Sequence, residues 1–362
     1  MSRSCHETHG LNMATTIAPV RLKGREIGPH KAIVAPLLSA RNVLTDSPWT
    51  FVALWLQRNR SHDALFYWQQ AQEFYNVSVG LPPQSPPLLL YYSYMNAAKA
   101  LLAAKRVTFN EYHGVRGYRR HGSPNKFSIA NDGIQIQTQG VLPSLAAYYG
   151  EMETSRRHTL QELFFNMVFI HRTYCLTYTS QKEMYLPLAN CAYVVENTSK
   201  RVFFRADIAK NVSLRSAVSR LPAAFVADST LGDRAIRSTS HLIWRRPSNP
   251  TTSELEGLAA MNRALREEVH YINGLQALWY VKAVTAGPRR LQRQLPTIVL
   301  GAMHCLSELC RYRPLQLASL LARQKNWLIS EFIQMSATQF IDEIASEMTG
   351  HQFFMPNVRP AV

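Results

Sequence analysis

The stretch from Leu88 to Leu142 constrains the fold most, because it joins an unbroken apolar helix to a basic, glycine-containing segment. Residues 88–105 contain no Pro or Gly and are rich in Ala, Leu, Met and Lys, which favour helix. Pro86 and Pro87 precede them, where the first helical turn tolerates a missing N–H. Apolar residues cover more than one face, which predicts a central, mostly buried helix of about five turns.

A cationic segment with aromatic residues follows this helix. We expect its glycines to make residues 113–122 a loop, followed by strands at 126–130 and 134–138 with a tight turn between them. Cations beside tyrosines are typical of surfaces that contact phosphates and unpaired bases. The candidate nucleic-acid-binding residues here are His113, Arg116, Arg119, Arg120 and Lys126. For His113 a structural alternative stays open, in which the imidazole bonds a backbone carbonyl and fixes the turn.

The charge balance points in the same direction. The 362 residues include 40 Lys and Arg against 24 Asp and Glu, which gives a net charge of +16 and a pI near 9.8. Such an excess attracts polyanions, and the guanidinium group matches phosphate with two parallel donors. Nucleic acid is therefore the expected partner, and an acidic protein is the alternative. The simplest alternative is that the positive charges are spread over the surface and only keep the protein soluble.

A second basic cluster is formed by Arg311 and Arg313, which flank Tyr312 and precede Pro314. Both arginines are candidates for nucleic-acid contact. The plainer interpretation is that cations at a helix end complement the helix dipole while Pro314 begins the next helix. Whether this cluster approaches the one at 113–126 depends on the fold.

The pattern of helices and strands predicts an α+β fold that is predominantly α-helical, a helical bundle with an inserted strand-rich middle region. We divide the chain into an extended N-terminal arm at 1–46, a helical domain with the basic loop and hairpin at 47–180, a strand-rich insertion at 181–290, and a C-terminal helical segment at 291–362 that packs on the first helical domain. Asp342, Glu343 and Glu347 are expected to form a solvated acidic face on the last helix.

Several functional classes leave no trace in the sequence. There is no phosphate-binding Gly-x4-Gly-Lys loop, no dinucleotide-binding glycine motif and no hydrolase nucleophile elbow. The five cysteines are scattered without zinc-site spacing, so we expect reduced thiols, no metal and no cofactor. No apolar run is long enough for a membrane span, and the N-terminus lacks the apolar core of a signal peptide, so a cytoplasmic location is expected.

Short sequence islands carry a resemblance to a known family. They are Pro48-Trp49, Pro87-Leu-Leu-Leu-Tyr-Tyr92, Ala98-Lys-Ala-Leu-Leu102, His113-Gly-Val115, Ile134-Gln-Ile-Gln-Thr-Gln-Gly-Val-Leu-Pro143 and Cys310-Arg-Tyr-Arg-Pro314. In this order they resemble the bacterial YaaC-like family over about residues 47–350. The family's activity is poorly defined, so the resemblance implies a fold more than a reaction.

The helix at 91–102 is also similar to a helix of HEPN domains, all-helical modules that are often ribonucleases in toxin and antiphage systems. These enzymes use an Arg-x4–6-His pair, in which the arginine binds phosphate and the histidine helps to activate the ribose hydroxyl. Six such pairs occur here, against roughly three expected by chance from 30 arginines and 12 histidines. The candidate catalytic residues are Arg106 with His113 and Arg263 with His270; Arg116 with His121 lies in the basic loop.

Three functions remain open from the sequence. The first is a nucleic-acid-associated binding protein, a non-catalytic subunit of a bacterial complex for which the HEPN likeness suggests antiphage defence. The second is a metal-independent HEPN-type endoribonuclease. The third is a scaffold for an acidic protein partner.

Overall fold

The computed structural model describes residues 17–121, 126–245, 250–322 and 326–354. Helix accounts for 44% and strand for 19%, which confirms the expectation of an α+β fold in which helix predominates. A HEPN-like arrangement of the helices is not established. The first part of the expected N-terminal arm, residues 1–16, lies outside the described residues.

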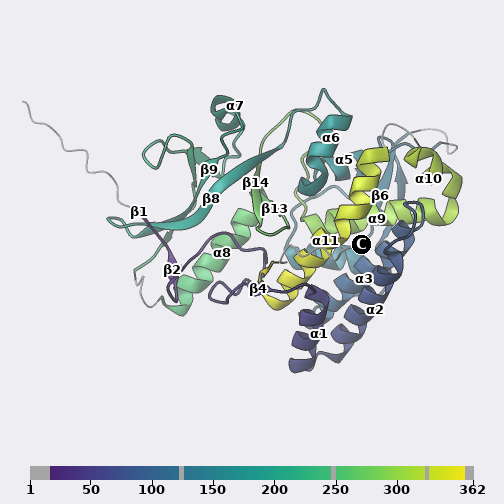
Figure 1. The fold of residues 1–362 in the computed structure, drawn as a ribbon, viewed down its shortest axis with the longest axis horizontal. Coiled ribbons are helices and arrows are strands. Elements are labelled where there is room, and N and C mark those ends of the chain that lie inside the picture. Colours follow the sequence, from purple (N-terminus) through teal and green to yellow (C-terminus); the bar gives the residue numbers. More distant parts are fainter. Residues whose placement is uncertain (1–16, 122–125, 246–249, 323–325, 355–362) are drawn as a thin grey trace, which may run out of the picture.

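Most of the helices gather at one end of the molecule around α3, which is the central helix expected from its sequence, whereas α7 and α8 lie with the large sheet (Figure 1). Of its 19 residues 14 are buried, and it packs against α2, α9 and α11. The helices are α1 (Pro48–Arg58), α2 (His62–Ser78), α3 (Pro86–Ala104), α4 (Val141–Tyr149), α5 (Leu160–Phe165), the 3-10 helix η1 (Val168–Ile170), α6 (His171–Thr177), α7 (Leu214–Val218), α8 (Thr252–Glu268), α9 (Leu295–Tyr312), α10 (Pro314–Leu321) and α11 (Asn326–Thr349).

An antiparallel sheet occupies the other end, and α8 covers it (Figure 1). Its path runs β10-β11-β9-β8-β14-β13, with β1 added to β8 and β12 added to β9. The strands are β1 (Ile17–Pro19), β8 (Tyr185–Glu196), β9 (Arg201–Ile208), β10 (Phe225–Ala227), β11 (Ala235–Ser238), β12 (Leu242–Ile243), β13 (Val269–Ile272) and β14 (Leu278–Lys282). Strand β14 lies inside this sheet, because it pairs with β13 on one side and with β8 on the other.

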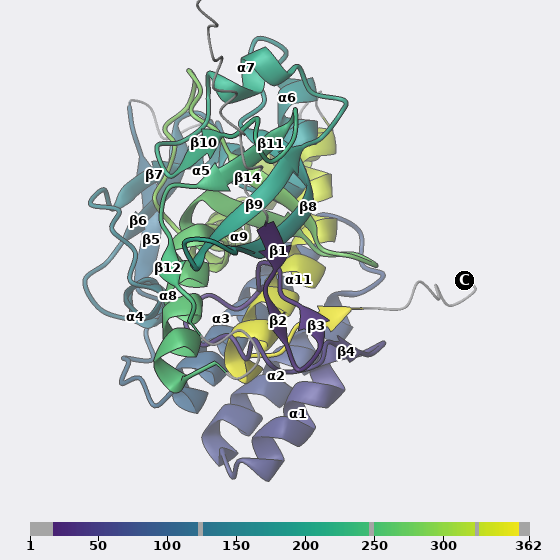
Figure 2. The same cartoon turned by 90° about the vertical axis from the view of Figure 1, so that its left-hand side faces the viewer.

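A separate three-stranded sheet lies against α9 and carries the basic segment. It consists of β5 (Val115–Arg119), β6 (Asp132–Ile136) and β7 (Arg157–Thr159), which Figure 2 shows together at one edge of the molecule. The hairpin predicted between 126–130 and 134–138 is therefore wrong in its first strand, because β6 pairs with β5 instead. Residues 126–130 belong to the connection between these two strands.

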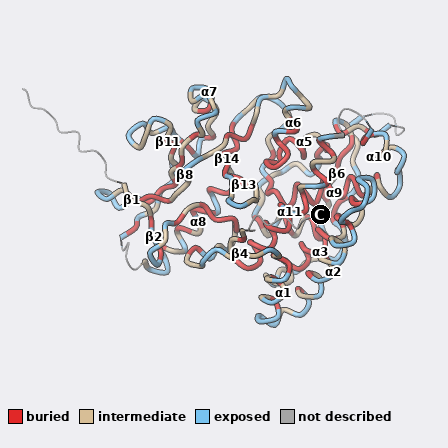
Figure 3. Tube along the Cα trace, in the orientation of Figure 1, coloured by how far each residue is buried: buried red, intermediate tan, exposed pale blue. Residues whose placement is uncertain are grey.

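Two small pairings complete the strands, β2 (Arg21–Leu22) with β3 (Arg25–Glu26), and β4 (Val43–Leu44) with β15 (Phe353–Phe354). The buried apolar residues form two clusters, one among the helices and the small sheet, the other between the large sheet, α8 and the segment at 20–38. Figure 3 shows this burial concentrated along α3, α9 and α11 and along the inner strands. The domain boundaries proposed from sequence remain a prediction.

Asp342, Glu343 and Glu347 of α11 are buried, so the expectation that they form a solvated acidic face is wrong. The Asp342 carboxylate accepts hydrogen bonds from Lys31 Nζ at 3.0 and 3.1 Å and from the Tyr271 hydroxyl at 2.7 Å. Glu343 pairs with buried Arg266 at 3.3 Å, and Glu347 accepts the backbone N–H of Ile33 at 2.6 Å. The cationic and amide partners come from distant parts of the chain, which a reading of the helix alone cannot reveal.

None of the helices in the described ranges combines the length and apolar character that crossing a bilayer requires.

Candidate nucleic-acid interface and adjoining pocket

The outer face of the small sheet carries two arginines in one row. Register places Arg116 of β5 opposite Gln135 of β6, and Gln135 opposite Arg157 of β7. Arg116 and Arg157 are exposed, and Arg116 Nη2 donates to Gln135 Oε1 at 3.1 Å. Neither arginine has a carboxylate partner among the described residues. Because side chains alternate along a strand, Tyr118 projects from the same face as Arg116.

Tyr118 and Arg157 are in contact on this outer face. The Arg157 guanidinium lies 5.5 Å from the centre of the Tyr118 ring, a cation–π arrangement that holds both side chains close to the surface. Arg120, also a sequence candidate, differs because its guanidinium is paired with Glu162 at 2.6 Å. Lys126 is exposed at the far end of the connection from β5 to β6. The outer face of β5–β6–β7 therefore combines an aromatic ring with cations not neutralised by a neighbouring carboxylate.

The inner face of the same sheet packs on α9 and ends in a pocket. Gly117, Ile134 and His158 share one row. The Ile134 side chain lies close to Gly301 of α9, since a Cβ added to Gly301 would be 2.5 Å from Ile134 Cδ1. Arg119 and Asp132 occupy the next position and form an ion pair at 2.5 Å. This alternation explains why neighbouring arginines of one strand have different roles: Arg116 faces outward and Arg119 faces the pocket.

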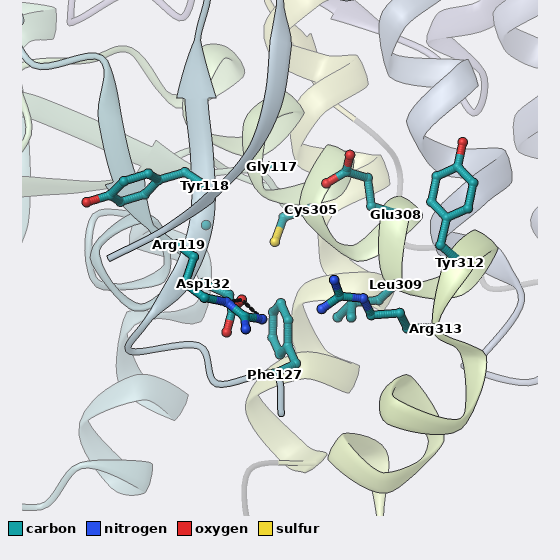
Figure 4. Close-up of a pocket in the computed structure, with 11 residues that line it drawn as sticks. Gly117, Tyr118, Arg119, Phe127, Asp132, Cys305, Glu308, Leu309, Tyr312 and Arg313 are labelled. Atoms are coloured by element: carbon teal, nitrogen blue, oxygen red, sulfur yellow. Dashed lines mark hydrogen bonds and ion pairs between the residues drawn. The ribbon is translucent and has the colours of Figure 1, made fainter. Parts of the chain in front are cut away.

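The pocket has a volume of about 480 Å³ and lies between β5–β6 and the end of α9 (Figure 4). Its polar lining includes the Arg119–Asp132 pair, Glu308 and Arg313, and its apolar lining includes Phe127. Partial burial raises the pKa of Glu308, and the positive charge of Arg313 opposes that shift. Arg119 and Arg313, which belong to the two basic clusters of the sequence, thus meet at one cavity. Arg311 instead lies over the exposed Tyr312 ring, 5.0 Å from its centre.

His113 lies between α3 and α9. Its Nδ1 is 2.5 Å from the Tyr91 hydroxyl, and its ring centre is 6.2 Å from that of His304. Burial, followed by the positive charges of Lys99 and Arg311, lowers the pKa of His113, and burial raises the pKa of Tyr91. The hydrogen bond therefore joins a neutral phenol to a neutral imidazole. This contact holds the imidazole, part of which is exposed, against the central helix. Its partner is a side-chain hydroxyl and not the backbone carbonyl of the structural alternative, so the role of His113 stays a prediction.

The turn that begins at His113 is packed backbone to backbone. Gly114 has φ +71°, and a Cβ added to it would lie 2.4 Å from Pro143 Cδ and 3.0 Å from the Cα of Gly140. The carbonyl oxygens of Tyr112 and His113 accept the N–H groups of Val141 and Leu142. Gly114 and Gly140, which belong to two of the sequence islands, must be glycines because their main chains are in contact.

Most of the islands that carry the family resemblance lie in or against α3 and α9. Cys310 Sγ of α9 lies 3.2 Å from the carbonyl oxygen of Gln84, two residues before α3 begins. Residues 40–348 match the model of the family described as YaaC-like Protein. The chain belongs to this family. The resemblance seen in the sequence is thereby confirmed for YaaC-like proteins, and no comparison supports the one to HEPN domains. No curated protein and no solved structure matches the chain.

The catalytic pairs taken from the HEPN pattern are not assembled in this YaaC-like chain. Arg106 is exposed just after α3, and no hydrogen bond joins it to His113 in the described residues. The Arg263 guanidinium donates to the carbonyl of Tyr149 at 3.3 Å. His270 is buried on β13, where desolvation lowers its pKa well below 6.5. A phosphate cannot reach His270 without local unfolding.

Sequence reasoning missed two residues of this YaaC-like chain that complete the site, Arg157 and Glu308. The Arg156-Arg157 pair is visible in the sequence, but β7 has only three residues and no strand pattern. Glu308 lies in a largely apolar helix, and nothing in the sequence places it beside the basic segment. Within the ranges that the structure describes, no group of three His, Cys, Asp or Glu side chains is placed to hold a metal ion.

Proposed function

We propose that this YaaC-like protein binds single-stranded nucleic acid on the outer face of β5–β6–β7. The observation that carries the proposal is the row formed by Arg116, Gln135 and Arg157, with Tyr118 beside it. Two strand spacings separate the arginines by roughly 10 Å. In such an arrangement the arginines can bind the phosphates of a nucleic-acid strand while the tyrosine ring stacks on one of its bases.

A single strand fits this face better than a duplex does. The sheet offers an aromatic ring and short polar side chains, and an unpaired base presents its flat face to such a ring. No described helix projects from the row formed by Arg116 and Arg157 to enter a groove, because α9 packs on the opposite face of the sheet. The net charge of +16 adds attraction for a polyanion over longer distances.

The test measures fluorescence anisotropy of labelled 12-nucleotide single strands of RNA and of DNA, and of the corresponding duplexes, from 50 to 300 mM salt with EDTA present. We expect binding whose affinity falls steeply with salt. In the double variant Arg116→Ala/Arg157→Ala the slope of log affinity against log salt should shrink by about 1.4, since each phosphate contact on a single strand contributes about 0.7.

The matched control is the double variant Arg58→Ala/Arg215→Ala, which removes the same charge from exposed positions on α1 and α7. It should retain the affinity and salt slope of the parent protein within about twofold, as expected when binding is local. Equal loss in both double variants would mean that net charge alone attracts the strand. Absence of binding at 50 mM salt would refute the proposal and favour an acidic protein partner.

A further inference from the structure

The pocket beside the proposed interface holds a carboxylate without a partner. Glu308 forms no hydrogen bond or ion pair with another side chain in the described part of the protein, whereas Asp132 in the same pocket is bound by Arg119 and by the Ser128 N–H at 2.8 Å. The carboxylate lies directly over the backbone of β5, since a Cβ on Gly117 would be 2.8 Å from Glu308 Oε2. Glycine at 117 therefore gives Glu308 its place in the pocket.

The other groups around the pocket complement this acceptor. In the view of Figure 4 the Phe127 ring lies between the Arg119–Asp132 pair and the Arg313 guanidinium, while Glu308 enters from α9. Leu309 and Tyr312 extend the apolar and aromatic lining. The cavity thus presents an acceptor, a donor and flat apolar surface within about 480 Å³, a volume in the range of small-ligand sites.

Guanine is the base that matches this arrangement. Its N1–H and N2–H lie side by side and give two donors for one carboxylate, and its O6 and N7 give two acceptors for one guanidinium. Adenine places a lone pair where guanine has N1–H, and uracil flanks its single N–H with two carbonyl oxygens, so both repel a carboxylate. Cytosine offers one donor next to a ring acceptor.

We propose that this pocket binds a guanine nucleotide, with Glu308 accepting from N1–H and N2–H and Arg313 donating to O6 and N7. The inference rests on the proposed function in that the nucleotide belongs to the strand on the outer face of the sheet. Tyr118 borders the pocket, but its ring points away from it (Figure 4) and contacts Arg157 on the outer face. Because β5 is the edge strand of this sheet, a nucleic-acid strand that passes around that edge can reach both places. A free guanine nucleotide has the same chemistry, and the experiment separates the two sources.

The experiment compares 12-nucleotide uridine strands in which one central position is G, A, C or U. We expect the strand with guanine to bind about five- to tenfold more tightly, the discrimination typical of one good bidentate contact. Glu308→Gln should remove this preference while leaving the affinity for the all-uridine strand unchanged. Glu256→Gln on α8, an exposed carboxylate outside the pocket, is the matched control and should keep the preference.

A second variant acts on Glu308 without changing it. Gly117→Ala adds a methyl group 2.8 Å from Glu308 Oε2. The methyl group should push the carboxylate out of its position and so abolish the guanine preference. Gly274→Ala is its control, because a Cβ there makes only an ordinary contact of 3.5 Å. Circular dichroism and the retained affinity for the all-uridine strand show that each variant is folded.

The outcomes separate the two proposals. Salt-sensitive binding that is equal for all four strands overturns the guanine assignment and supports the proposed function. Calorimetry with GMP supplies the other arm: binding of GMP that is lost in Glu308→Gln, with no binding of any strand, supports the guanine pocket and overturns the proposed function. No binding of strands or of GMP overturns both.

Discussion

At the scale of single residues, His304 illustrates how burial tunes a side chain in the helical core. Its ring packs against Tyr91 at 5.1 Å between centres, and burial, with His113 acting in the same direction, lowers the pKa of His304 from 6.5 to about 4. The unfolded chain therefore binds a proton more readily than the folded chain. The stability that neutral His304 contributes is present above pH 6.5 and is lost as the pH falls from 6.5 towards 4.

The variant His304→Gln should consequently make folding less sensitive to acid. We expect the plot of unfolding free energy against pH to become shallower between pH 6.5 and 4, by up to about 1.4 kcal/mol per pH unit for one proton. Urea titrations at several pH values measure this slope. The exposed His62→Gln is the control, and a slope equal to that of the parent protein in His304→Gln would contradict the assignment.

Gly114 offers a second residue-scale test, because it combines backbone strain with a close contact. Gly114→Ala should destabilise the protein both through its φ of +71° and through the collision with Pro143. Gly80→Ala isolates the first effect, since Gly80 has φ +80° and open space around it. We expect a cost of about 1 to 2 kcal/mol for Gly80→Ala and a further cost of about 1 to 3 kcal/mol for Gly114→Ala, measured by urea unfolding.

At the scale of elements, the sequence predicted the helices well and the small sheet poorly. Helix α3 was predictable because two prolines mark its start and no breaker interrupts it. Strand β5 was read as a loop because Gly117 and two arginines obscure its alternation of apolar and polar residues. Its strand character comes from pairing with β6 and from packing on α9, which are tertiary contacts.

The link between α11 and the N-terminal arm gives an element-scale prediction. Lys31 Nζ is fully buried and bonds Asp342, Asn273 Oδ1 at 2.9 Å and the carbonyl of Phe353 at 2.5 Å. Burial disfavours both charges, raising the pKa of Asp342 and lowering that of Lys31. Asp342→Asn leaves the ammonium without its counter-charge, and we expect a loss of about 3 to 5 kcal/mol in unfolding free energy.

The double variant Lys31→Met/Asp342→Leu tests whether the pair itself stabilises the fold. It should recover most of that loss, because replacing both charges removes their desolvation cost. Arg21→Ala breaks the exposed pair with Glu26 and should cost less than about 1 kcal/mol. A double variant as unstable as Asp342→Asn would show that the contacts to Asn273 and Phe353 dominate.

At the scale of the whole molecule, the two hydrophobic cores are joined through α11. Asp342 reaches the arm through Lys31 and β13 through Tyr271. We therefore expect Asp342→Asn to accelerate hydrogen exchange of the most protected amides in both α3 and β9, by about 100-fold if the loss is near 3 kcal/mol. Acceleration confined to α3 would show that the cores open independently.

The candidate site is a property of the whole molecule, which limits what the sequence can reveal about it. Both basic clusters are visible in the sequence, but only the fold brings Arg119 and Arg313 to one pocket. Arg116 and Arg119 lie on opposite faces of the small sheet, because side chains alternate between the two faces along β5. The Glu308 carboxylate fits into the pocket because Gly117, 191 residues earlier in the chain, has no side chain.

The contacts of Lys31 and Ile33 with α11 also have a consequence for biosynthesis. Their partners Asp342 and Glu347 lie more than 310 residues downstream. At about 5 to 20 residues per second, a ribosome needs roughly 15 to 60 s to translate that interval. Throughout this time the nascent arm carries a cation without its native counter-charge and backbone amides without their native acceptor, and these contacts form only when α11 emerges.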